Sequence, residues 1–421
     1  MERWHYLRGG EVSLLIDATP GGEALPRIVH FGADLGIAPD FTAIAGAAPI
    51  VMWGARLDLP CPPCVLPGLE SGYFGLPAIA PEPMRRWSLE GVERAGDGVT
   101  LRLQGQDDHI VLDYRLSAHG VLATRVQAPG SWVTAMALPL PGWAHEAMSF
   151  GGDWAREFAP VRQILTHGAL VFESRRGRPG HDRFPGVAVG APGFGEDHGA
   201  VYGVTLGWSG SHRLSVERLR EGDVVVQAGA LDGESPWAYA TYSPRGLNGA
   251  MQAFHAFVRE RIVPKYAAAK PRPVHYNTWE AIYFKHDEAT LRVLADRAAA
   301  VGAERFVLDD GWFNGRSDDR AGLGDWSVDA IKFPNGLAPL IAHVRGVGME
   351  FGLWVEPEMV NPDSDLARAH PDWIRRDADG GLVLQRHQAA LNLANPDVVE
   401  HLFTTLSGLL AAHEISYLKW D

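Results

Sequence analysis

Two ionisable side chains close the sequence in an arrangement that could do covalent chemistry. Lys419 and Asp421 stand two positions apart at the end of the apolar run Ile415–Asp421. Residues two apart on a β-strand point to the same face, so these two side chains and Tyr417 are predicted to be neighbours. A nearby ammonium group favours the ionised carboxylate. Such a carboxylate at a strand end can act as a nucleophile, although a strand-end ion pair without chemistry gives the same pattern.

Four apolar runs of the second half end in polar or aromatic residues. The runs are Val274–Trp279, Arg305–Asp309, Met349–Val355 and Ile415–Trp420. Asp309 and Asp310 close the second run, and Glu356 follows the third. In a (β/α)8 barrel, the active site gathers side chains from the carboxyl ends of several strands. The four endings therefore predict one site that all four strands build.

The residue types at these strand ends suit a sugar. Asp309 and Asp310 can accept hydrogen bonds from neighbouring hydroxyl groups. Trp279, Trp312 and Trp354 can offer flat faces to a pyranose ring, or they can pack in the core. A pocket rich in carboxylates also stabilises an oxocarbenium-like transition state. Paired aspartates can hold a divalent metal instead, but no nearby histidine or third carboxylate converges on them, so neither a metal nor a cofactor is predicted.

Helical patterns separate the four runs and must position their ends. The predicted helices are Glu288–Val301, Leu337–Val347 and Pro396–His413. Alternating strands and helices imply a parallel sheet, and strands this apolar need cover on both faces. Residues 274–421 are therefore predicted to form the first four βα units, half of a (β/α)8 TIM barrel.

The first half of the chain has a different pattern of apolar residues, and residues 1–246 are predicted to form an antiparallel β-sandwich. Short alternating or apolar runs recur there between Gly, Pro, Asp and Ser residues. The runs are Val12–Ile16, Val99–Leu103, His109–Leu116, Val121–Val126, Leu170–Phe172, Val201–Leu206, Leu214–Val216 and Val224–Gln227. Residues 247–273 follow as a helix and linker, because an apolar stripe with a helical period precedes Pro271 and Pro273.

Composition narrows the function classes. The formal net charge of −13 over 421 residues argues against nucleic acid and anionic membranes as partners. No signal peptide or membrane span is visible, so a soluble cytoplasmic protein is predicted.

The two cysteines, Cys61 and Cys64, form a C-P-P-C sequence of loop composition. Further ligands are missing nearby, so neither a zinc site nor a redox pair is favoured.

Longer motifs run through the whole chain in a fixed order. Those of the second half are Asn277–Glu280, Phe306–Phe313, Gly324–Trp326, Lys332–Pro334, Gly348–Met359, Asp363–Leu366, His370–Trp373, Arg386–Gln388 and Tyr417–Asp421. Those of the first half are Gly152–Glu157, Glu173–Gly177 and Phe254–Val258. Together they resemble bacterial α-galactosidases of glycoside hydrolase family 36. The resemblance implies a multidomain protein with an N-terminal supersandwich of antiparallel sheets before a catalytic barrel.

The resemblance also implies a role for each site residue. Asp421 matches the nucleophile that forms the covalent glycosyl-enzyme. Asp309 and Asp310 match the pair that binds the galactose hydroxyls O4 and O6. The other matches lie around the sugar: the cations Arg386 and Lys419 and the aromatic walls Trp279 and Trp354.

The chain departs from the family pattern in two respects. It has Arg-His-Gln at 386–388 where the family has Arg-Asn-Gln, and the family's general acid/base lies beyond Asp421, as do a cysteine and a glycine that line the sugar. A retaining hydrolase needs two carboxyl groups about 5–5.5 Å apart. Glu356 and Glu358 do not match the acid by position. The 421 residues are therefore interpreted as a fragment that ends within the barrel and is inactive alone.

The predicted function is that of a retaining α-galactosidase. It would hydrolyse terminal non-reducing α-D-galactosyl residues of raffinose-type oligosaccharides by double displacement. Two alternatives stay open: an α-N-acetylgalactosaminidase or raffinose-synthase-like galactosyltransferase, and a non-catalytic sugar-binding protein. The resemblance further implies a homo-oligomer, commonly a tetramer.

Overall fold

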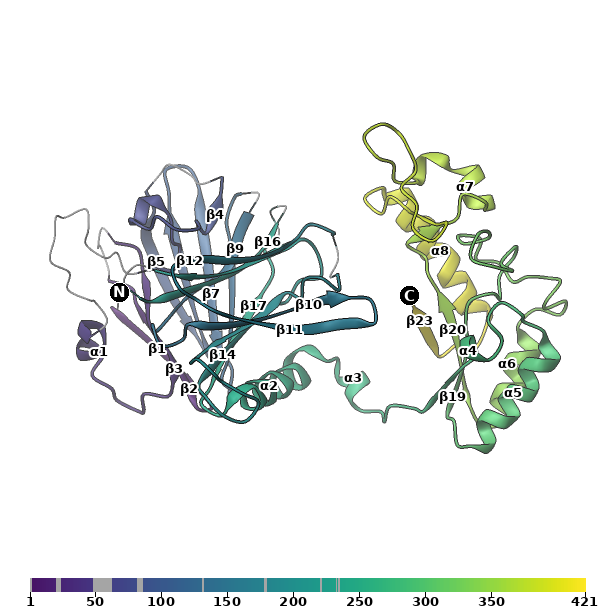
Figure 1. Cartoon of the computed structure of the whole chain (residues 1–421), viewed down its shortest axis with the longest axis horizontal. Coiled ribbons are helices and arrows are strands. Elements are labelled where there is room, and N and C mark those ends of the chain that lie inside the picture. The colour runs from purple at the N-terminus through teal and green to yellow at the C-terminus, as the bar shows by residue number, and fades with distance from the viewer. Residues whose placement is uncertain are drawn as a thin grey trace. The chain divides into compact units, whose positions relative to one another are not determined.

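The chain forms two compact units, Met1–Ala268 and Ala269–Asp421, each with its own hydrophobic core. The structure is a computed structural model (Figure 1). It describes residues 2–19, 24–47, 63–81, 86–130, 132–177, 180–219, 222–231, 233 and 235–421. Cys61 lies outside the described residues, and Cys64 is buried. Within the described parts, no helix combines the length and the apolar character needed to cross a bilayer.

Antiparallel sheets build the first unit. A 9-stranded sheet has the order β11-β10-β13-β14-β17-β8-β7-β6-β5, a 5-stranded sheet has the order β12-β15-β16-β9-β4, and β1, β2 and β3 form a third. The strands are β1 Trp4–Gly9, β2 Val12–Asp17, β3 Arg27–Ala33, β4 Ile79–Ala80, β5 Ser88–Ala95, β6 Gly98–Gln104, β7 His109–Leu116, β8 Val121–Gln127, β9 Trp132–Leu140, β10 Glu146–Asp153, β11 Arg156–Ile164, β12 Gly168–Ser174, β13 Gly186–Gly190, β14 Val201–Leu206, β15 His212–Arg218, β16 Val224–Leu231 and β17 Ala238–Ser243. A short helix α1, Phe41–Ala47, follows β3.

Strand β6 shows why these sequences form a sandwich. Val99, Leu101 and Leu103 are buried, whereas Arg102 between them is exposed. A period of two places one face of the strand on the core and the other toward water. All eight strands predicted for this half fall within observed strands. The predicted antiparallel β-sandwich is therefore confirmed.

Helix α2, Gly246–Phe257, packs within the first unit. Its Ala250 is buried in a cluster with Val201 of the large sheet. The helix continues as a π-helical turn, Val258–Ile262, and a short helix α3, Lys265–Ala268, ends the unit. The helix predicted for this segment thus packs against the large sheet of the first unit.

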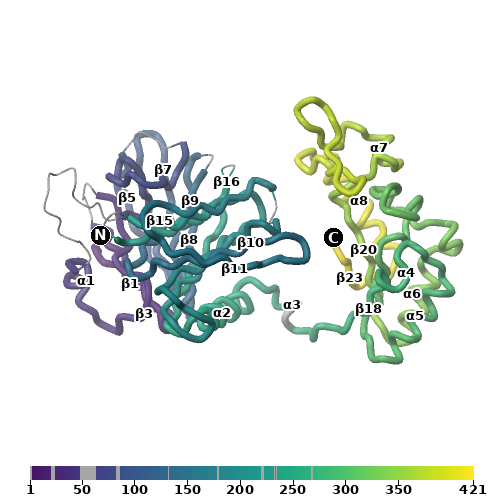
Figure 2. The backbone as a smooth tube through the Cα atoms, viewed as in Figure 1, coloured from purple at the N-terminus to yellow at the C-terminus, as the bar shows by residue number. Residues whose placement is uncertain are grey.

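Four parallel strands in the order β18-β19-β20-β23 form the centre of the second unit. They are β18 His275–Asn277, β19 Arg305–Leu308, β20 Glu350–Val355 and β23 Tyr417–Trp420. The helices are α4 Trp279–Ile282, α5 Glu288–Ala300, α6 Ala338–Gly346, α7 Asp365–Ala369 and α8 Pro396–Ala412, and Met359–Val360 pairs with Ala389–Ala390 as β21 and β22. Figure 2 follows this alternation from β18 to β23. Consecutive strands lie side by side, as in a (β/α)8 barrel.

Helices α5, α6 and α8 cover the strands from within one core. Leu291 of α5, Leu340 of α6 and Leu402 of α8 join Phe306 and Phe351 of the strands in a single cluster. Their buried residues recur every three or four positions, which is the period of one helix face. The three predicted helices agree with α5, α6 and α8 to within one residue at each end.

The first predicted strand of this unit was wrong at its end. The run 274–279 was expected to be extended to Trp279, but β18 ends at Asn277 and Trp279 begins α4. The side chain of Asn277 accepts a hydrogen bond from the Trp279 backbone N–H at 2.8 Å. This local bond competes with the strand and turns the chain.

The backbone turns sharply after β19, at Gly311. Its φ of 115° is a conformation that residues with a Cβ rarely adopt. A Cβ at this position would lie 3.1 Å from the Cα atom of Phe284 and 3.3 Å from Nε2 of His286. Both the backbone angle and the close neighbours therefore require glycine directly after the Asp309–Asp310 pair.

We expect Gly311→Ala to lower the stability of the strand ends around Asp309 by about 1–3 kcal/mol, because strain and crowding act together. Hydrogen exchange of the β19 amides measures this loss. The matched control is Gly336→Ala, at a φ of 70° with no atom within 4 Å of the new Cβ; it should cost only about 1 kcal/mol. Equal costs at the two positions would contradict the crowding at Gly311.

His286 is buried beneath this turn. Burial, together with the positive charge of Lys332, lowers the pKa of His286 to about 4 from an ordinary value of 6.5. The folded protein thus holds a neutral imidazole that the unfolded chain protonates at higher pH.

This difference predicts acid sensitivity. The stabilisation from neutral His286 is complete above pH 6.5 and is lost as the pH falls from 6.5 to about 4. We expect His286→Phe to flatten the fall in unfolding free energy over that window, measured by urea titration at a series of pH values. At alkaline pH, where the imidazole is neutral in both the folded and the unfolded chain, the difference in unfolding free energy between the variant and the wild type measures only the effect of the substitution on packing. An unchanged slope in the variant would show that another group causes the acid sensitivity.

Candidate active site

The carboxyl ends of the strands bring four acidic side chains together. Asp309 and Asp310 follow β19, Glu356 follows β20 and Asp421 follows β23. The backbone N–H of Asp421 donates to the carbonyl of Val355 at 3.0 Å. Sheet pairing therefore extends one residue past β23 and fixes Asp421 level with the end of β20.

Lys419 links two of these acids. Its Nζ donates to Oδ2 of Asp309 at 2.9 Å and lies 3.9 Å from Oδ2 of Asp421. The sequence predicted the neighbour two positions along, but the nearer partner is Asp309. Asp309 is only 2% exposed. A buried carboxylate needs a cation far more than an exposed one does.

Further hydrogen bonds hold both oxygens of Asp309. Its Oδ2 also accepts from Nδ2 of Asn277 at 2.5 Å, and its Oδ1 accepts from the backbone N–H of Asp310 at 2.9 Å. The backbone N–H of Asp309 donates to the hydroxyl of Thr278 at 2.9 Å. Bonds from β18, β19 and β23 thus lock this carboxylate in one orientation.

Asp310 has its own buried cation, Arg316. The guanidinium donates two parallel hydrogen bonds to the carboxylate, at 2.9 and 2.8 Å, and both side chains are buried. Burial raises the pKa of Asp310, while the bonds and charge of Arg316 oppose that rise. The charge of Asp309 adds to it, and that of the exposed Arg386 lowers it. Arg386 is therefore within electrostatic reach of Asp310.

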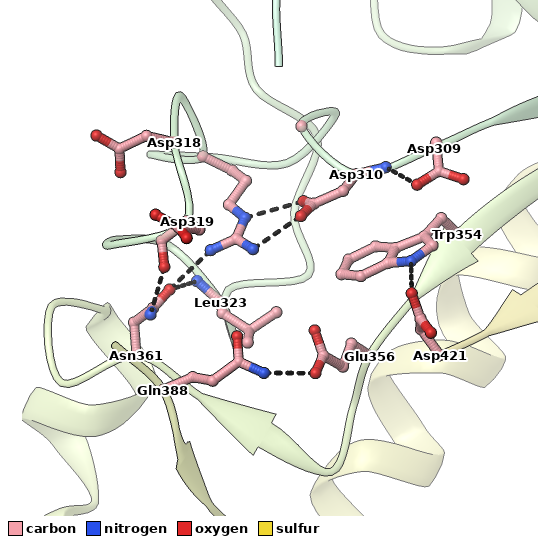
Figure 3. A network of polar contacts seen from close by, with 12 residues as sticks. Asp309, Asp310, Asp318, Asp319, Leu323, Trp354, Glu356, Asn361, Gln388 and Asp421 are labelled. Atoms are coloured by element: carbon pink, nitrogen blue, oxygen red, sulfur yellow. Dashed lines mark hydrogen bonds and ion pairs between the residues drawn. The ribbon is translucent and has the colours of Figure 1, made fainter. Parts of the chain in front are cut away.

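An indole group orients Asp421. Nε1 of Trp354 donates to Oδ2 of Asp421 at 3.0 Å, as Figure 3 shows. Nε1 of Trp312 in turn donates to the backbone carbonyl of Trp354 at 2.9 Å. Trp312 and Trp354 are buried in a cluster with Phe313. Of the two possibilities left open by the sequence, the structure places both rings in the core. Trp354 presents an N–H group to the site instead.

Trp279 remains half-exposed beside the acids. Its ring makes edge contacts with Tyr283 and Phe284, each with a centroid separation of 5.1 Å. Its backbone is bonded to Asn277, the residue that also holds Asp309. Of the three tryptophans considered from the sequence, Trp279 is the one with a partly open ring.

Sequence reasoning missed Arg316, Asn361 and Gln388. Arg316 accompanies Asp310, Asn361 accepts a hydrogen bond from Arg316 at 2.9 Å, and Gln388 donates one to Glu356 at 2.5 Å. A signal for Arg316 exists, since a buried aspartate requires a cation and this arginine follows six residues later. In the described residues, no group of three or more His, Cys, Asp or Glu side chains could hold a metal ion.

Two family models match the chain in succession. The model described as "Glycosyl hydrolase family 36 N-terminal domain" matches residues 99–238, and the model "Melibiase" matches residues 233–421. The first covers most of the large antiparallel sheet, and the second covers the whole parallel sheet with the acidic residues.

Curated relatives are similar over much of the chain. An alpha-galactosidase from Escherichia coli is 46% identical in an alignment 378 residues long, which covers 84% of this chain and 52% of that protein. Alpha-galactosidase AgaA from Geobacillus stearothermophilus is 38% identical over 298 residues, 68% of this chain and 41% of that protein. The chain thus spans about half the length of the curated relatives it matches.

Solved structures have the same fold over nearly the whole chain. The crystal structure of the alpha-galactosidase from Lactobacillus brevis has a TM-score of 0.88 at 27% identity and covers 99% of this chain and 63% of that one. A variant of Geobacillus stearothermophilus AgaA has a TM-score of 0.87 at 28% identity, covering 99% and 65%. Family models, sequence relatives and solved structures agree: the chain belongs to glycoside hydrolase family 36.

Proposed function

We propose that the protein is a retaining α-galactosidase that removes terminal non-reducing α-D-galactosyl residues from raffinose-type oligosaccharides. One observation carries the proposal: Lys419 bridges the buried Asp309 and the exposed Asp421 at the ends of β19 and β23. A binding carboxylate and a nucleophilic carboxylate are thereby held on either side of one ammonium group. Family relatives named alpha-galactosidases support the choice of sugar.

In the proposed first step, Asp421 attacks the anomeric carbon. Its Oδ2 receives the Trp354 N–H and lies near Lys419. Oδ1 accepts no hydrogen bond from the described residues and is available to form the glycosyl ester. The bond from the anomeric carbon to the leaving-group oxygen breaks as the ester bond forms. Water then cleaves the ester, so two inversions give retention.

Asp309 and Asp310 are proposed to bind galactose hydroxyl groups. Both carboxylates are fixed and charged by contact with a cation, so they accept hydrogen bonds without reorganising. Lys419 keeps further N–H capacity that can reach a sugar oxygen. Arg386 is exposed and near Asp310, and Trp279 has a partly open ring; they are proposed as the remaining contacts.

The size of the substrate is inferred from relatives. Variants of Geobacillus stearothermophilus AgaA have been crystallised with stachyose and with raffinose. We extend this substrate class to the present protein. By the same family resemblance, we propose a cytoplasmic homo-oligomer.

We expect Asp421→Ala in the full-length protein to reduce turnover of an aryl α-galactoside by about a thousandfold or more, since the nucleophile is lost. Galactose binding, measured by calorimetry, should persist because Asp309 and Asp310 remain. Azide added to Asp421→Gly should occupy the vacated space and yield a β-galactosyl azide. The matched control is Asp379→Ala, an exposed acid in a distant turn, which should leave turnover unchanged. Retained turnover in Asp421→Ala would remove Asp421 as the nucleophile.

The purified 421-residue chain is expected to show no turnover of aryl α-galactosides. Double displacement needs a second carboxyl group to protonate the leaving group, about 5–5.5 Å from the nucleophile. Glu356 is engaged by Gln388, and we assign it no acid role. The full-length protein serves as the active control, and circular dichroism checks that the 421-residue chain is folded. Robust turnover by this chain would defeat our view that it lacks the acid.

A further inference from the structure

We propose that Asn361 and Glu356 are positioning residues that hold the C-terminal half of the turn Gln385–Gln388, at His387 and at Gln388, so that Arg386 stays within electrostatic reach of Asp310. The inference rests on the proposed function, because Arg386 matters there as a contact to the sugar. Glu356 directly follows β20, and Asn361 directly follows β21. The turn comes later in the chain, immediately before β22. Figure 3 shows both residues close to the acids of the site.

The turn itself has an unfavourable backbone. Gln385 and Gln388 exchange two backbone hydrogen bonds, at 2.8 and 3.0 Å, which leaves Arg386 and His387 as a two-residue loop. Both residues are left-handed, with φ of 50° and 66°. Residues other than glycine avoid this region, although histidine and asparagine enter it more often than most.

Asn361 holds the turn through its backbone. Its Nδ2 donates to the carbonyl of His387 at 2.8 Å, and its Oδ1 accepts from Nη1 of Arg316 at 2.9 Å. The same amide bonds to the carbonyl of Asp319 and to the N–H of Leu323. Asn361 is 0% exposed, so a lost bond could not be replaced by bulk water.

Glu356 holds the residue that follows His387 in the turn. The buried amide of Gln388 donates to Oε1 of Glu356 at 2.5 Å. A bond to an ionised acceptor is stronger than one between neutral groups. Burial raises the pKa of Glu356, and the negative charges of Asp421 and Asp310 add to that rise, while the Gln388 hydrogen bond opposes it. Glu356 directly follows Val355, whose carbonyl accepts the N–H of Asp421, so its bond to Gln388 ties the turn to the strand ends of the site.

The contacts form a continuous path from the sugar-binding acid to the turn. Asp310 binds Arg316, Arg316 binds Asn361, and Asn361 binds the His387 carbonyl. Among the described residues, the Arg386 guanidinium itself makes no hydrogen bond. Its place beside Asp310 is thus set by the backbone that carries it. A strained backbone keeps its conformation only where its surroundings fix it.

The test is a double-mutant cycle in the full-length protein. Asn361→Asp keeps the acceptor for Arg316 but replaces the donor to His387 with an oxygen. We expect KM for an aryl α-galactoside to rise about tenfold, with kcat changed less than about threefold. In the Arg386→Ala background, Asn361→Asp should then change KM by less than about twofold, because its effect passes through Arg386. The matched control, Asn395→Asp at the start of α8, keeps its cap and should leave KM unchanged.

Variants of Glu356 provide a second, independent test if the Asn361→Asp variant does not fold. Glu356→Ala should raise KM in the same direction and lose its effect in the Arg386→Ala background. Glu356→Gln retains an acceptor for Gln388 and should restore most of the binding. It also separates positioning from proton transfer, since an amide cannot donate the proton that an acid would. Loss of kcat in Glu356→Gln would make Glu356 a catalytic residue and overturn our inference.

The outcomes distinguish this inference from the proposed function. Active wild-type protein with effects that persist in full after Arg386→Ala would overturn the positioning role alone. Wild-type protein that neither binds galactose nor turns over α-galactosides would overturn the proposed function, and the positioning role with it. A tenfold KM effect that disappears with Arg386 supports both.

Discussion

The second unit depends on keeping two carboxylates charged at the buried end of a parallel sheet. An unpaired buried charge costs several kcal/mol. Asp309 and Asp310 are both buried, and each meets a cation from a different part of the chain. Lys419 comes from β23, and Arg316 comes from the loop after β19. The end of β23 and the loop after β19 must therefore both reach the end of β19 for the unit to fold with Asp309 and Asp310 ionised.

The Arg316–Asp310 and Lys419–Asp309 ion pairs have different structural roles. Arg316 is fully buried and fixed by Asn361, so its pair with Asp310 is a rigid structural connection. Lys419 is partly exposed, and it ties β19 to β23 across the intervening β20. Buried ion pairs contribute little net stability but impose a defined arrangement. In this unit, the ion pairs fix the ends of β19 and β23 relative to each other. They thereby also fix the position of Asp421, which follows β23.

Much of this architecture could be predicted from the sequence, because periodicity is local. The four strands, their helices and the polar residues at their ends follow from the spacing of apolar residues. The partner of Lys419 could not be predicted, since burial of Asp309 arises only when β18, β19 and β23 assemble. The choice between core packing and an open ring face for Trp312 and Trp354 could not be predicted for the same reason. Whether an indole packs in the core or faces a ligand depends on which layers cover it.

The balance of charge in the site also follows from these contacts. Asp309 and Lys419 offset each other, as do Asp310 and Arg316. Asp421 receives only a shared and longer contact from Lys419, and Glu356 is held by a neutral amide. Among the described residues, Asp421 and Glu356 thus have no cation of their own, while the exposed Arg386 acts on Asp310 from a longer range. An oxocarbenium-like transition state carries positive charge. In the reaction proposed above, the carboxylate of Asp421 would stabilise this charge more than it stabilises the neutral substrate, and such a difference accelerates a reaction.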